Sequence, residues 1–599
     1  MRRCAYSEKI MLKRFFIAFT GSLAAIWLSA FLFFILVCVI AVSLMLSGKS
    51  DRVGLNEHTI LRIDLSGQIE ELPRMGSLFD ELYGLEEKKE KLALNQIVNS
   101  ILNAADDKSI DGIYINCGGS SAGIATRCEI VKAIETFKKS GKWVLAYGDY
   151  YTQGDYLIAS AADSVYVNPE GLVTISGLSS TVFFFKNLLD KAGVDVQVIK
   201  VGTYKSAVEP YILDKMSEAS REQTMGYVNG IWNTLTPIIS KNRGVSPADV
   251  NSWADSLCVT WSASELVANK VVDRTVYRHE FEDILASKSS RDDRDDLRMI
   301  TPSQYAEVRS IYKNDDKDHH IAVLYAVGDI VDSGKEGISA EAMVPEIFDL
   351  ADDDDVDGLV LRVNSGGGSA FASEQIWEAL ERFKSKGKPL YVSMGDVAAS
   401  GGYYISCGAD RIYASPQTLT GSIGIFGMIP CVKTLLNDKI GITTSTVGSN
   451  AHPTFMNLTD PLTPVERAAM QRRINRGYET FVGRCAEGRG VSADSIKAIA
   501  EGRVWDGVMA KKIGLVDRFG TLNDAISDMA QELKLKKYTV SVYPQQTPTF
   551  LQMLLAVRDE AEAVAVERQL GESYEIYQTV RRIGTLEPVQ CRMEYIEIK

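Results

Sequence analysis

The sequence predicts an α/β protein in which two related lobes follow an N-terminal membrane anchor. Three observations lead to this fold class: strand-like apolar segments alternate with amphipathic helical segments, the same motifs occur twice at a nearly constant spacing, and one apolar segment near the start is long enough to cross a bilayer. The length of 599 residues suits several domains, and 46% hydrophobic with 24% charged residues is typical of a globular body. The net charge of −13, with no basic cluster in the body, argues against a nucleic-acid partner.

The predicted anchor is the segment Phe15–Ser47, which contains no charged residue and, as a helix, exceeds the roughly 30 Å apolar core of a bilayer. The flank before it carries Arg2, Arg3, Lys9, Lys13 and Arg14 against the single acid Glu8. The positive-inside rule therefore predicts a cytoplasmic N-terminus, with the rest of the chain on the other side. A cleaved signal peptide is the alternative, but its apolar region usually spans only about 7–15 residues and no A-x-A-like site follows Leu46.

The internal repeat relates the two halves after the anchor at an offset of 246 or 247 residues. The matching pairs include Asp111–Gly112 with Asp357–Gly358, Gly141–Lys142 with Gly387–Lys388, Gly148–Asp149 with Gly395–Asp396, and Arg243–Ser246 with Arg489–Ser492. The predicted strands are Ile60–Leu65, Gly112–Ile115 and Trp143–Tyr147 in the first half, and Ile321–Val327, Gly358–Val363 and Pro389–Met394 in the second. Because helical segments separate these strands, each half predicts a parallel sheet with right-handed crossovers.

Composition places the domain boundaries as follows: a basic tip and anchor at 1–50, an N-terminal lobe at 51–286, a charged linker at 287–320, a C-terminal lobe at 321–535 and a tail at 536–599. The first lobe carries a charged insertion at 70–95, which predicts a surface excursion. In the tail, residues 549–570 predict an amphipathic helix.

A small-residue segment after the third strand of the second lobe, VAASGGYYI, predicts a strand-to-helix turn that carries Ser400. A serine at the first turn of a helix lies among unpaired N–H groups, which suits a nucleophile and a nearby oxyanion. The alternative is that Ser400 caps the helix.

The two lobes differ in a complementary way at the positions that carry chemistry. The first lobe has Gln153 opposite Ser400, so it lacks the nucleophile, whereas the second lobe has Ala451 opposite Lys205, so it lacks the lysine. This pattern predicts that Ser400 and Lys205 act together as a Ser–Lys dyad, with a desolvated, neutral lysine as general base. A surface lysine paired with Glu209 is the alternative for Lys205.

Two glycine-rich turns complete the predicted site. In TGSIG, the hydroxyl of Ser422 is suited to orient the lysine amine. In NSGGGS, the N–H groups of Gly367 and Gly368, together with Gly401, predict an oxyanion hole. A phosphate-binding loop is disfavoured because the G-x-G-x-x-G register and a P-loop lysine are missing.

The remaining reactive residues predict neither metal nor cofactor. The nine cysteines are scattered without C-x-x-C spacing, and no H-E-x-x-H motif occurs. His452 has no evident partner acid in the sequence, which argues against a Ser-His-Asp triad.

Four motifs resemble the signal peptide peptidase A (protease IV) family in its long two-lobe form. They are GTYKSAVEPY at 202–211, VNSGGGS at 363–369, MGDVAASGGYYIS at 394–406 and LTGSIGIFG at 419–427, and the similarity covers nearly the whole chain. One departure is Gly366, where the family often has proline.

The resemblance implies a membrane-anchored serine endopeptidase with crotonase-like (Clp-protease-like) lobes that degrades residual signal peptides through an acyl-enzyme. It implies Ser400 as nucleophile, Lys205 as general base and Ser422 as the lysine-orienting serine. It further implies a homotetramer in the inner (cytoplasmic) membrane, with the catalytic lobes on the periplasmic side. A crotonase-fold enzyme acting on acyl-CoA and a catalytically dead scaffold are the alternatives; the anchor argues against the first, and Ser400 with Lys205 in opposite lobes argues against the second.

Overall fold

The computed structural model describes residues 19–23, 25–33, 35–36, 55–73, 92–334, 337–544 and 588–594. The chain divides into two compact units, Met1–Asn56 and Glu57–Lys599. The described residues of the first unit before residue 37 are helical, and no helix within the described ranges combines the length and hydropathy needed to cross a membrane. Much of the predicted span Phe15–Ser47, and the whole predicted tail helix at 549–570, lie outside the described residues.

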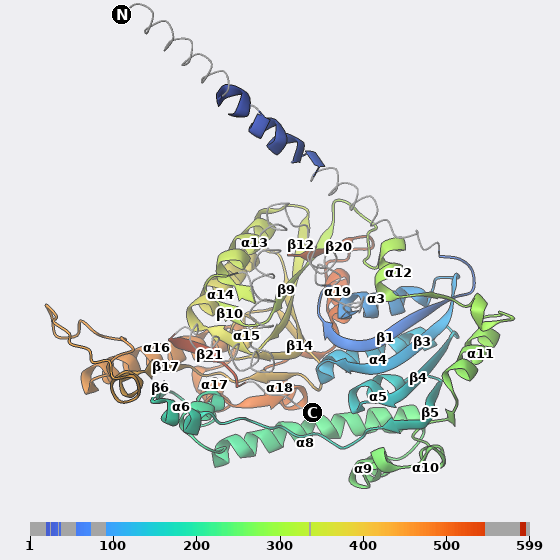
Figure 1. Cartoon of the computed structure of the whole chain (residues 1–599), viewed down its shortest axis with the longest axis horizontal. Coiled ribbons are helices and arrows are strands. Elements are labelled where there is room, and N and C mark those ends of the chain that lie inside the picture. The colour runs from blue at the N-terminus through green and yellow to red at the C-terminus, as the bar shows by residue number, and fades with distance from the viewer. Residues whose placement is uncertain are drawn as a thin grey trace, which may run out of the picture. The chain divides into compact units, whose positions relative to one another are not determined.

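The first lobe is built on a seven-stranded sheet whose strand pairs are all parallel, with the order β2-β1-β3-β4-β5-β7 and β8 beside β1. Its strands are β1 (Thr59–Glu70), β2 (Leu92–Ala93), β3 (Ile110–Ser121), β4 (Trp143–Tyr151), β5 (Ser164–Val173), β7 (Arg274–Thr275) and β8 (Arg298–Ile300). The crossover helices are α3 (Leu94–Ala104), α4 (Ile124–Lys138) and α5 (Gln153–Ala159) (Figure 1). The predicted strands of this half are therefore confirmed as β1, β3 and β4.

The second lobe repeats this arrangement around β9 (His320–Val327), β12 (Val356–Ser365) and β14 (Leu390–Ala399), which contain the three strands predicted for this half. Its eight-stranded sheet has the order β18-β16-β14-β12-β9-β20, with β15 and β19 at the β14 side. The further strands are β15 (Arg411–Ala414), β16 (Leu419–Gly421), β18 (Val504–Asp506), β19 (Arg518–Phe519) and β20 (Thr539–Tyr543). Helices α13 (Ala340–Asp352), α14 (Ala370–Ser385), α15 (Gly401–Tyr404) and α19 (Leu522–Glu532) belong to the same lobe.

A third sheet joins the two lobes. Its order is β11-β10-β13-β21-β17-β6, where β6 (Asp195–Lys200) comes from the first lobe and pairs antiparallel with β17 (Phe426–Cys431) of the second. The other members are β10 (Ile330–Val331), β11 (Ile338–Ser339), β13 (Gly367–Ser369) and β21 (Val589–Arg592). Sequence periodicity did not predict this sheet, because its strands are short and come from distant parts of the chain.

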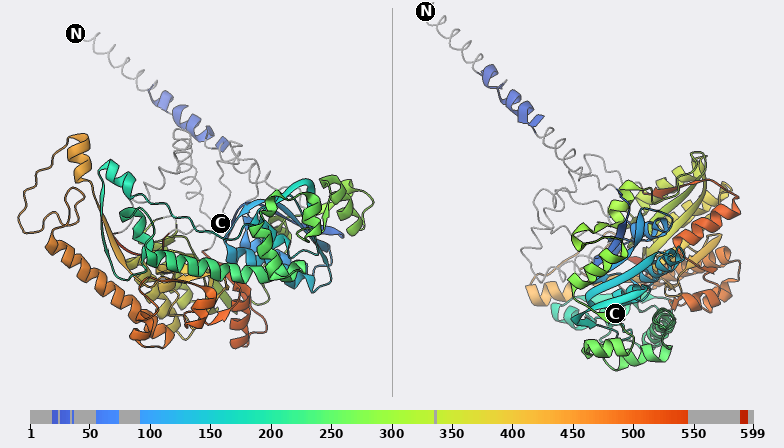
Figure 2. Two further views of the ribbon diagram at one scale, coloured as in Figure 1. Left: turned by 90° about the horizontal axis from the view of Figure 1, so that it is seen from below. Right: turned by 90° about the vertical axis from the view of Figure 1, so that its right-hand side faces the viewer.

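The long helix α8 (Glu218–Arg243) also connects the lobes: it runs beneath them in Figure 1 and crosses in front of them in the view from below in Figure 2. Near its start, Gln223 Oε1 accepts a hydrogen bond of 3.1 Å from the backbone N–H of Val504 in the second lobe. At its end, Arg243 forms an ion pair of 2.9 Å with Asp273 in the first lobe.

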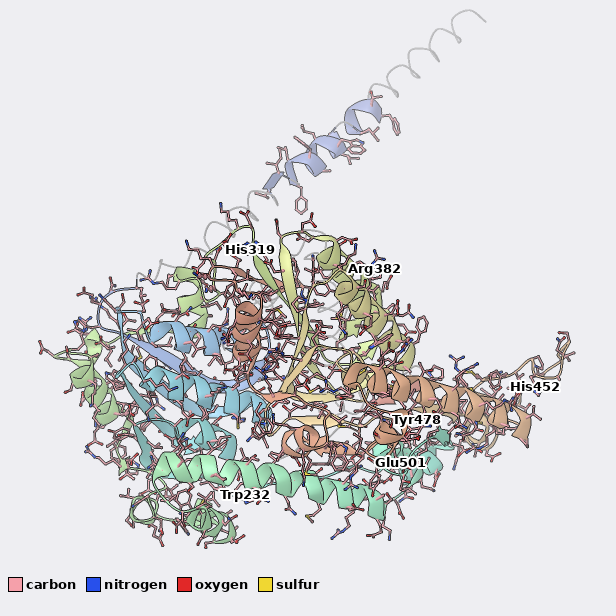
Figure 3. The ribbon with its side chains drawn as sticks, turned by 180° about the vertical axis from the view of Figure 1, so that it is seen from behind. Trp232, His319, Arg382, His452, Tyr478 and Glu501 are labelled. Atoms are coloured by element: carbon pink, nitrogen blue, oxygen red, sulfur yellow. The ribbon has the colours of Figure 1, made fainter. Side chains whose placement is uncertain are left out.

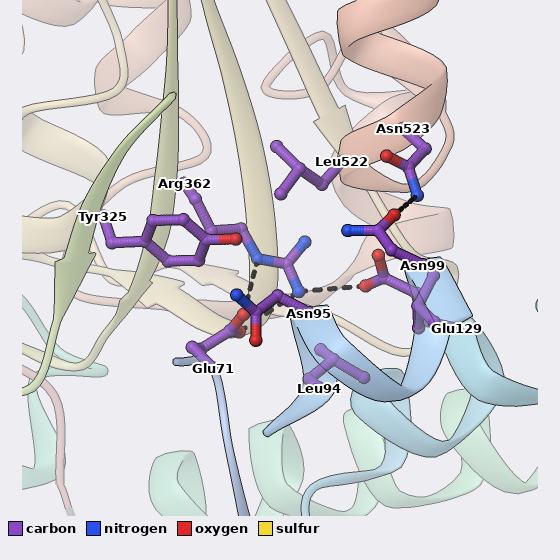
Figure 4. A pocket seen from close by; sticks show the side chains of 10 residues that line it. Glu71, Leu94, Asn95, Asn99, Glu129, Tyr325, Arg362, Leu522 and Asn523 are labelled. Carbon is purple, nitrogen blue, oxygen red and sulfur yellow. Dashed lines mark hydrogen bonds and ion pairs between the residues drawn. The ribbon is translucent and has the colours of Figure 1, made fainter. Parts of the chain in front are cut away.

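A buried polar cluster lies between the lobes around Arg362 of β12 (Figure 4). The guanidinium donates to Glu71 at 3.0 and 3.1 Å and to Glu129 at 2.9 Å, both from the first lobe. Burial raises the pKa of Glu71, although the charge of Arg362 acts in the opposite direction. Glu71 and Leu94 are buried, so the prediction that the 70–95 insertion is a surface excursion is wrong at both of its ends; residues 74–91 lie outside the described ones.

Candidate active site

Ser400 occupies the sharp turn that the sequence predicted between strand and helix. β14 ends at Ala399 and α15 begins at Gly401, while Ser400 itself has φ 56° and ψ −112°, a left-handed conformation that costs a non-glycine residue about 1–3 kcal/mol. Its N–H donates to Gly421 O at 2.8 Å, and its carbonyl accepts from Tyr404 N at 2.8 Å. The side chain makes no helix-capping hydrogen bond, so the capping alternative is wrong and the hydroxyl is available to another partner.

Lys205 reaches this turn because β6 brings its segment across to the second lobe. The side chain is 1% exposed, and its Nζ lies 2.7 Å from Ser400 Oγ, 3.0 Å from Ser422 Oγ and 3.0 Å from Ser422 O. Glu209, the surface partner considered for the lysine, instead accepts hydrogen bonds from Ser217. The three polar residues predicted from opposite lobes thus meet within one chain.

Burial lowers the pKa of Lys205 to about 7, with the nearby Cys591 and Glu594 acting in the opposite direction. The cause is desolvation: a charged ammonium loses its water in this pocket, so the neutral amine is favoured. A neutral amine has two N–H donors and one lone pair. This inventory fits donation to Ser422 O and Oγ together with acceptance of the Ser400 O–H.

Two glycines that the sequence did not single out make room for the lysine. A Cβ on Gly502, which has φ +82°, would lie 2.7 Å from Lys205 Cα and Cβ, and a Cβ on Gly424 would lie 3.3 Å from Lys205 Cδ.

Next to the lysine in the chain, hydrogen bonds hold the backbone segment: Gln223 Nε2 donates to Ser206 Oγ at 2.9 Å and to Tyr204 O at 3.2 Å. Tyr204 N donates to the carbonyl of Glu501, which Figure 3 labels. Glycine and glutamine have no reactive group that would mark them in a sequence, so the roles of Gly502, Gly424 and Gln223 are recognised only from their contacts.

The glycines predicted for the oxyanion hole gather beside Ser400. A Cβ on Gly367, which has φ +97°, would lie 2.6 Å from Gly401 N and 2.1 Å from Cys591 O. Gly368 pairs with Cys591 across β13 and β21. The N–H of Gly367 donates to Ser365 Oγ at 3.1 Å, so the Gly368 and Gly401 amides are the better placed donors for a bound carbonyl.

His452 lies apart from this site on the loop that projects from the second lobe (Figure 3). Its Nδ1 is 3.1 Å from Glu466 Oε1, so His452 has an acidic neighbour, but this pair does not contact Ser400 and forms no Ser-His-Asp arrangement with it. The partner of Ser400 is nevertheless Lys205 rather than a histidine.

In the first lobe, the turn that corresponds to the oxyanion glycines is filled from within. The carboxylate of Asp155, which aligns with Gly402, accepts from Gly119 N at 2.9 Å and from Ser120 N at 3.1 Å. Arg127 balances this buried charge with an ion pair of 3.1 Å. Gln153, which aligns with Ser400, binds the backbone of Ser176 and Gly177.

A serine hydroxyl in a strained turn, next to a buried amine with a lowered pKa, is the arrangement expected of a serine hydrolase. Here the hydroxyl and the amine come from two repeated lobes. The family model for peptidase family S49 matches the chain twice, over residues 136–290 and 382–536. The chain therefore belongs to peptidase family S49 and is a serine peptidase with two tandem family domains.

Two full-length relatives support the same assignment. The chain is 36% identical to "Protease 4" of Salmonella typhi over 88% of this chain and 86% of the relative, and 31% identical to "Protease 4" of Haemophilus influenzae over 90% and 91%. A ClpP1 mutant structure from Listeria monocytogenes aligns with 18% identity over 34% of this chain and 94% of its own, with a TM-score of 0.24. The Clp-like description of the lobes therefore stays a prediction.

Proposed function

We propose that the chain is a membrane-anchored endopeptidase that uses Ser400 and Lys205 to cut extended apolar peptides, including residual signal peptides, through an acyl-enzyme. The observation that carries the proposal is the 2.7 Å contact between Ser400 Oγ and the buried Lys205 Nζ. The pKa of about 7 supports it, because a lysine general base must be neutral at working pH.

The proposed chemistry follows from the contacts. Lys205 Nζ takes the Ser400 proton while Ser400 Oγ attacks the substrate carbonyl carbon, and the N–H groups of Gly368 and Gly401 stabilise the oxyanion. The C–N bond then breaks as Lys205 returns the proton to the leaving amine. A water, deprotonated by the same lysine, hydrolyses the acyl-enzyme and restores Ser400. Ser422 is a positioning residue in this scheme, because its two oxygens hold Nζ toward Ser400.

The sheet around the site supports an extended, apolar substrate. The strand β21 lies paired between β13 and β17, and strand addition to a sheet uses the same backbone pairing to bind an extended peptide. Ala207, Val208, Phe426 and Met428 form an apolar cluster beside β17. We further propose the membrane as partner through the segment Phe15–Ser47, the periplasmic side of the inner membrane as location, and a homotetramer, as the family resemblance implies.

A serine-directed fluorophosphonate probe tests the nucleophile on the detergent-solubilised full chain. We expect labelling of the wild type, loss of labelling in Ser400→Ala, and unchanged labelling in Gln153→Ala, the matched first-lobe variant. Fluorogenic leucine- and alanine-rich peptides should be cut faster than charged ones. Labelling that persists in Ser400→Ala would refute the assignment.

A further inference from the structure

A short segment of the second lobe, residues 501–504, lies between the loop of the general base and the loop of the serine that orients it. On one side, Ser422 N donates to the carbonyl of Arg503 at 2.7 Å. On the other side, Tyr204 N donates at 3.0 Å to the carbonyl of Glu501, which Figure 3 labels. Because one segment binds both loops through its backbone, its position sets the distance between the lysine amine and the serine oxygens.

The side chain of Arg503 adds a second connection between this segment and the lysine loop. Its Cζ lies 4.6 Å from the ring centre of Tyr204 and 4.5 Å from that of Trp505. Its Nη2 forms an ion pair of 3.0 Å with Glu222, and the Tyr204 hydroxyl donates to the same carboxylate at 3.2 Å. A planar guanidinium can stack on aromatic rings while its N–H groups bind a carboxylate. Arg503 therefore ties Tyr204, the residue before Lys205, to the second lobe.

The first lobe contains the same turn without the arginine. An offset of 244 residues, at which a tryptophan and a Val-Asp-Arg motif coincide in the two halves, aligns Leu257 with Glu501 and Val259 with Arg503. Leu257 has φ 52° and Glu501 has φ 54°, a left-handed conformation that is uncommon outside glycine. The turn therefore forms with valine in the arginine position, and the cation is present only in the lobe whose turn contacts the lysine loop.

We propose that Arg503 is a positioning residue for the general base: by holding Tyr204, it keeps Lys205 Nζ beside Ser400 Oγ and against Ser422. This inference rests on the proposed function, in which Lys205 takes the Ser400 proton. The guanidinium itself contacts two rings and a carboxylate, not the reacting atoms. Without it, the lysine loop loses a side-chain connection to the second lobe, so the amine moves away from the hydroxyl and gains water.

Peptide hydrolysis by the detergent-solubilised full chain, measured across pH, tests this role. In Arg503→Ala, kcat above the inflection should fall about 10–100-fold, because a small displacement of the base costs much of its rate. KM should change by less than about twofold, since the arginine does not contact the reacting atoms. The inflection of kcat/KM should move up by about one pH unit, because a better hydrated Lys205 is easier to protonate.

The other groups near the amine stay in place in this variant. Cys591 and Glu594 act on the charge of Lys205, and Lys200 Nζ donates to its carbonyl at 3.3 Å. A shift of the inflection therefore reports the position of the lysine. A purely structural loss would lower the melting temperature and the yield of active protein without moving the inflection.

Two further variants complete the test. Arg503→Lys keeps a cation for Glu222 but lacks the flat guanidinium, so it should show both effects at a smaller size; it decides the test if Arg503→Ala does not fold. Arg518→Ala removes a surface ion pair with Asp528 at the edge of the same sheet and is the matched control. It should leave kcat and the inflection unchanged.

The outcomes separate this inference from the proposed function. If the Arg503 variants keep kcat within twofold of the wild type, or lose activity with an unmoved inflection, the positioning role is wrong. The proposed function still stands in that case, provided that the wild type shows the inflection near pH 7 and Lys205→Ala is inactive. If Lys205→Ala retains activity, the proposed function fails and the inference fails with it.

Discussion

The same glycine-rich turn has different neighbours in the two lobes. In the first lobe, the carboxylate of Asp155 occupies the N–H groups of Gly119 and Ser120, and Arg127 balances its charge. In the second lobe, Gly402 takes the aligned position and brings no carboxylate, and Gly368 beside Ser400 pairs with Cys591 of β21. One turn is filled by a side chain of its own lobe, whereas the other pairs with the backbone of a strand.

This difference shows how a duplicated site is divided between its copies. A buried carboxylate in the turn stabilises the first lobe but takes the donors that an oxyanion would need. The second lobe retains those donors and Ser400, yet it depends on the first lobe for Lys205. Neither lobe holds a complete site.

The largest expected effect comes from removing either side chain of the Ser400–Lys205 pair. Ser400→Ala and Lys205→Ala should each lower kcat by at least about 10⁴-fold, because each residue takes part in the same proton transfer. The same peptidase assay tests rescue: adding Ala451→Lys to the Lys205→Ala variant should not restore activity, because the lysine must come from the first lobe. Mixing the two inactive proteins should give no recovery, because both residues belong to one chain; recovery would show that the pair forms between chains.

The second prediction concerns a carboxylate introduced at Gly402, the second-lobe position that aligns with Asp155. Gly402→Asp should lower kcat/KM by about 10²–10³-fold by occupying the oxyanion donors. A Cβ at this position would lie 2.6 Å from Ser365 O, so Gly402→Ala is the matched control for the steric effect. Equal losses in Asp and Ala variants would mean that crowding, rather than the carboxylate, is responsible.

The third prediction concerns pH. Because neutral Lys205 is the active form and its pKa is about 7, kcat/KM should fall about tenfold per pH unit below 7 and stay level above it. Burial also raises the pKa of Glu594 to about 7. A variant truncated after Glu587, which lacks Glu594, should therefore be measured in parallel. The inflection should remain in that variant, whereas an inflection near pH 4 would indicate a carboxylate base.

The smallest effect on activity is expected in the first lobe. Asp155→Asn should change kcat/KM by less than about twofold, yet it should destabilise the protein by about 3 kcal/mol because Arg127 loses its buried counter-charge. Thermal melting checks the stability. The double variant Arg127→Met, Asp155→Leu should recover part of the loss, and a large loss of activity in Asp155→Asn would contradict a purely structural role.

The sequence predicted the repeat and three central strands in each half, out of seven strands in one sheet and eight in the other. It also predicted the residues that meet at the site, because Gln153 and Ala451 mark what each lobe lacks. It did not predict the sheet that joins the lobes. β13 has three residues and β21 has four, which is too short for periodicity to indicate a strand.

Residues that act through their shape or their partners cannot be recognised from the sequence alone. Asp155 and Arg362 are ordinary charged residues until burial and ion pairing are known. Gly502 matters because of a close approach to Lys205, which depends on a contact across the lobes. Such contacts follow from tertiary packing, not from local pattern.

The pairing of β6 with β17 also sets the moment at which a growing chain becomes a protease. Lys205 and Ser400 are 195 positions apart, so the ribosome completes the lysine-bearing lobe long before it adds the nucleophile. No partly synthesised chain that ends before the second lobe holds both groups. Lys205 and Ser400 can therefore meet only after β17 has been made and has paired with β6.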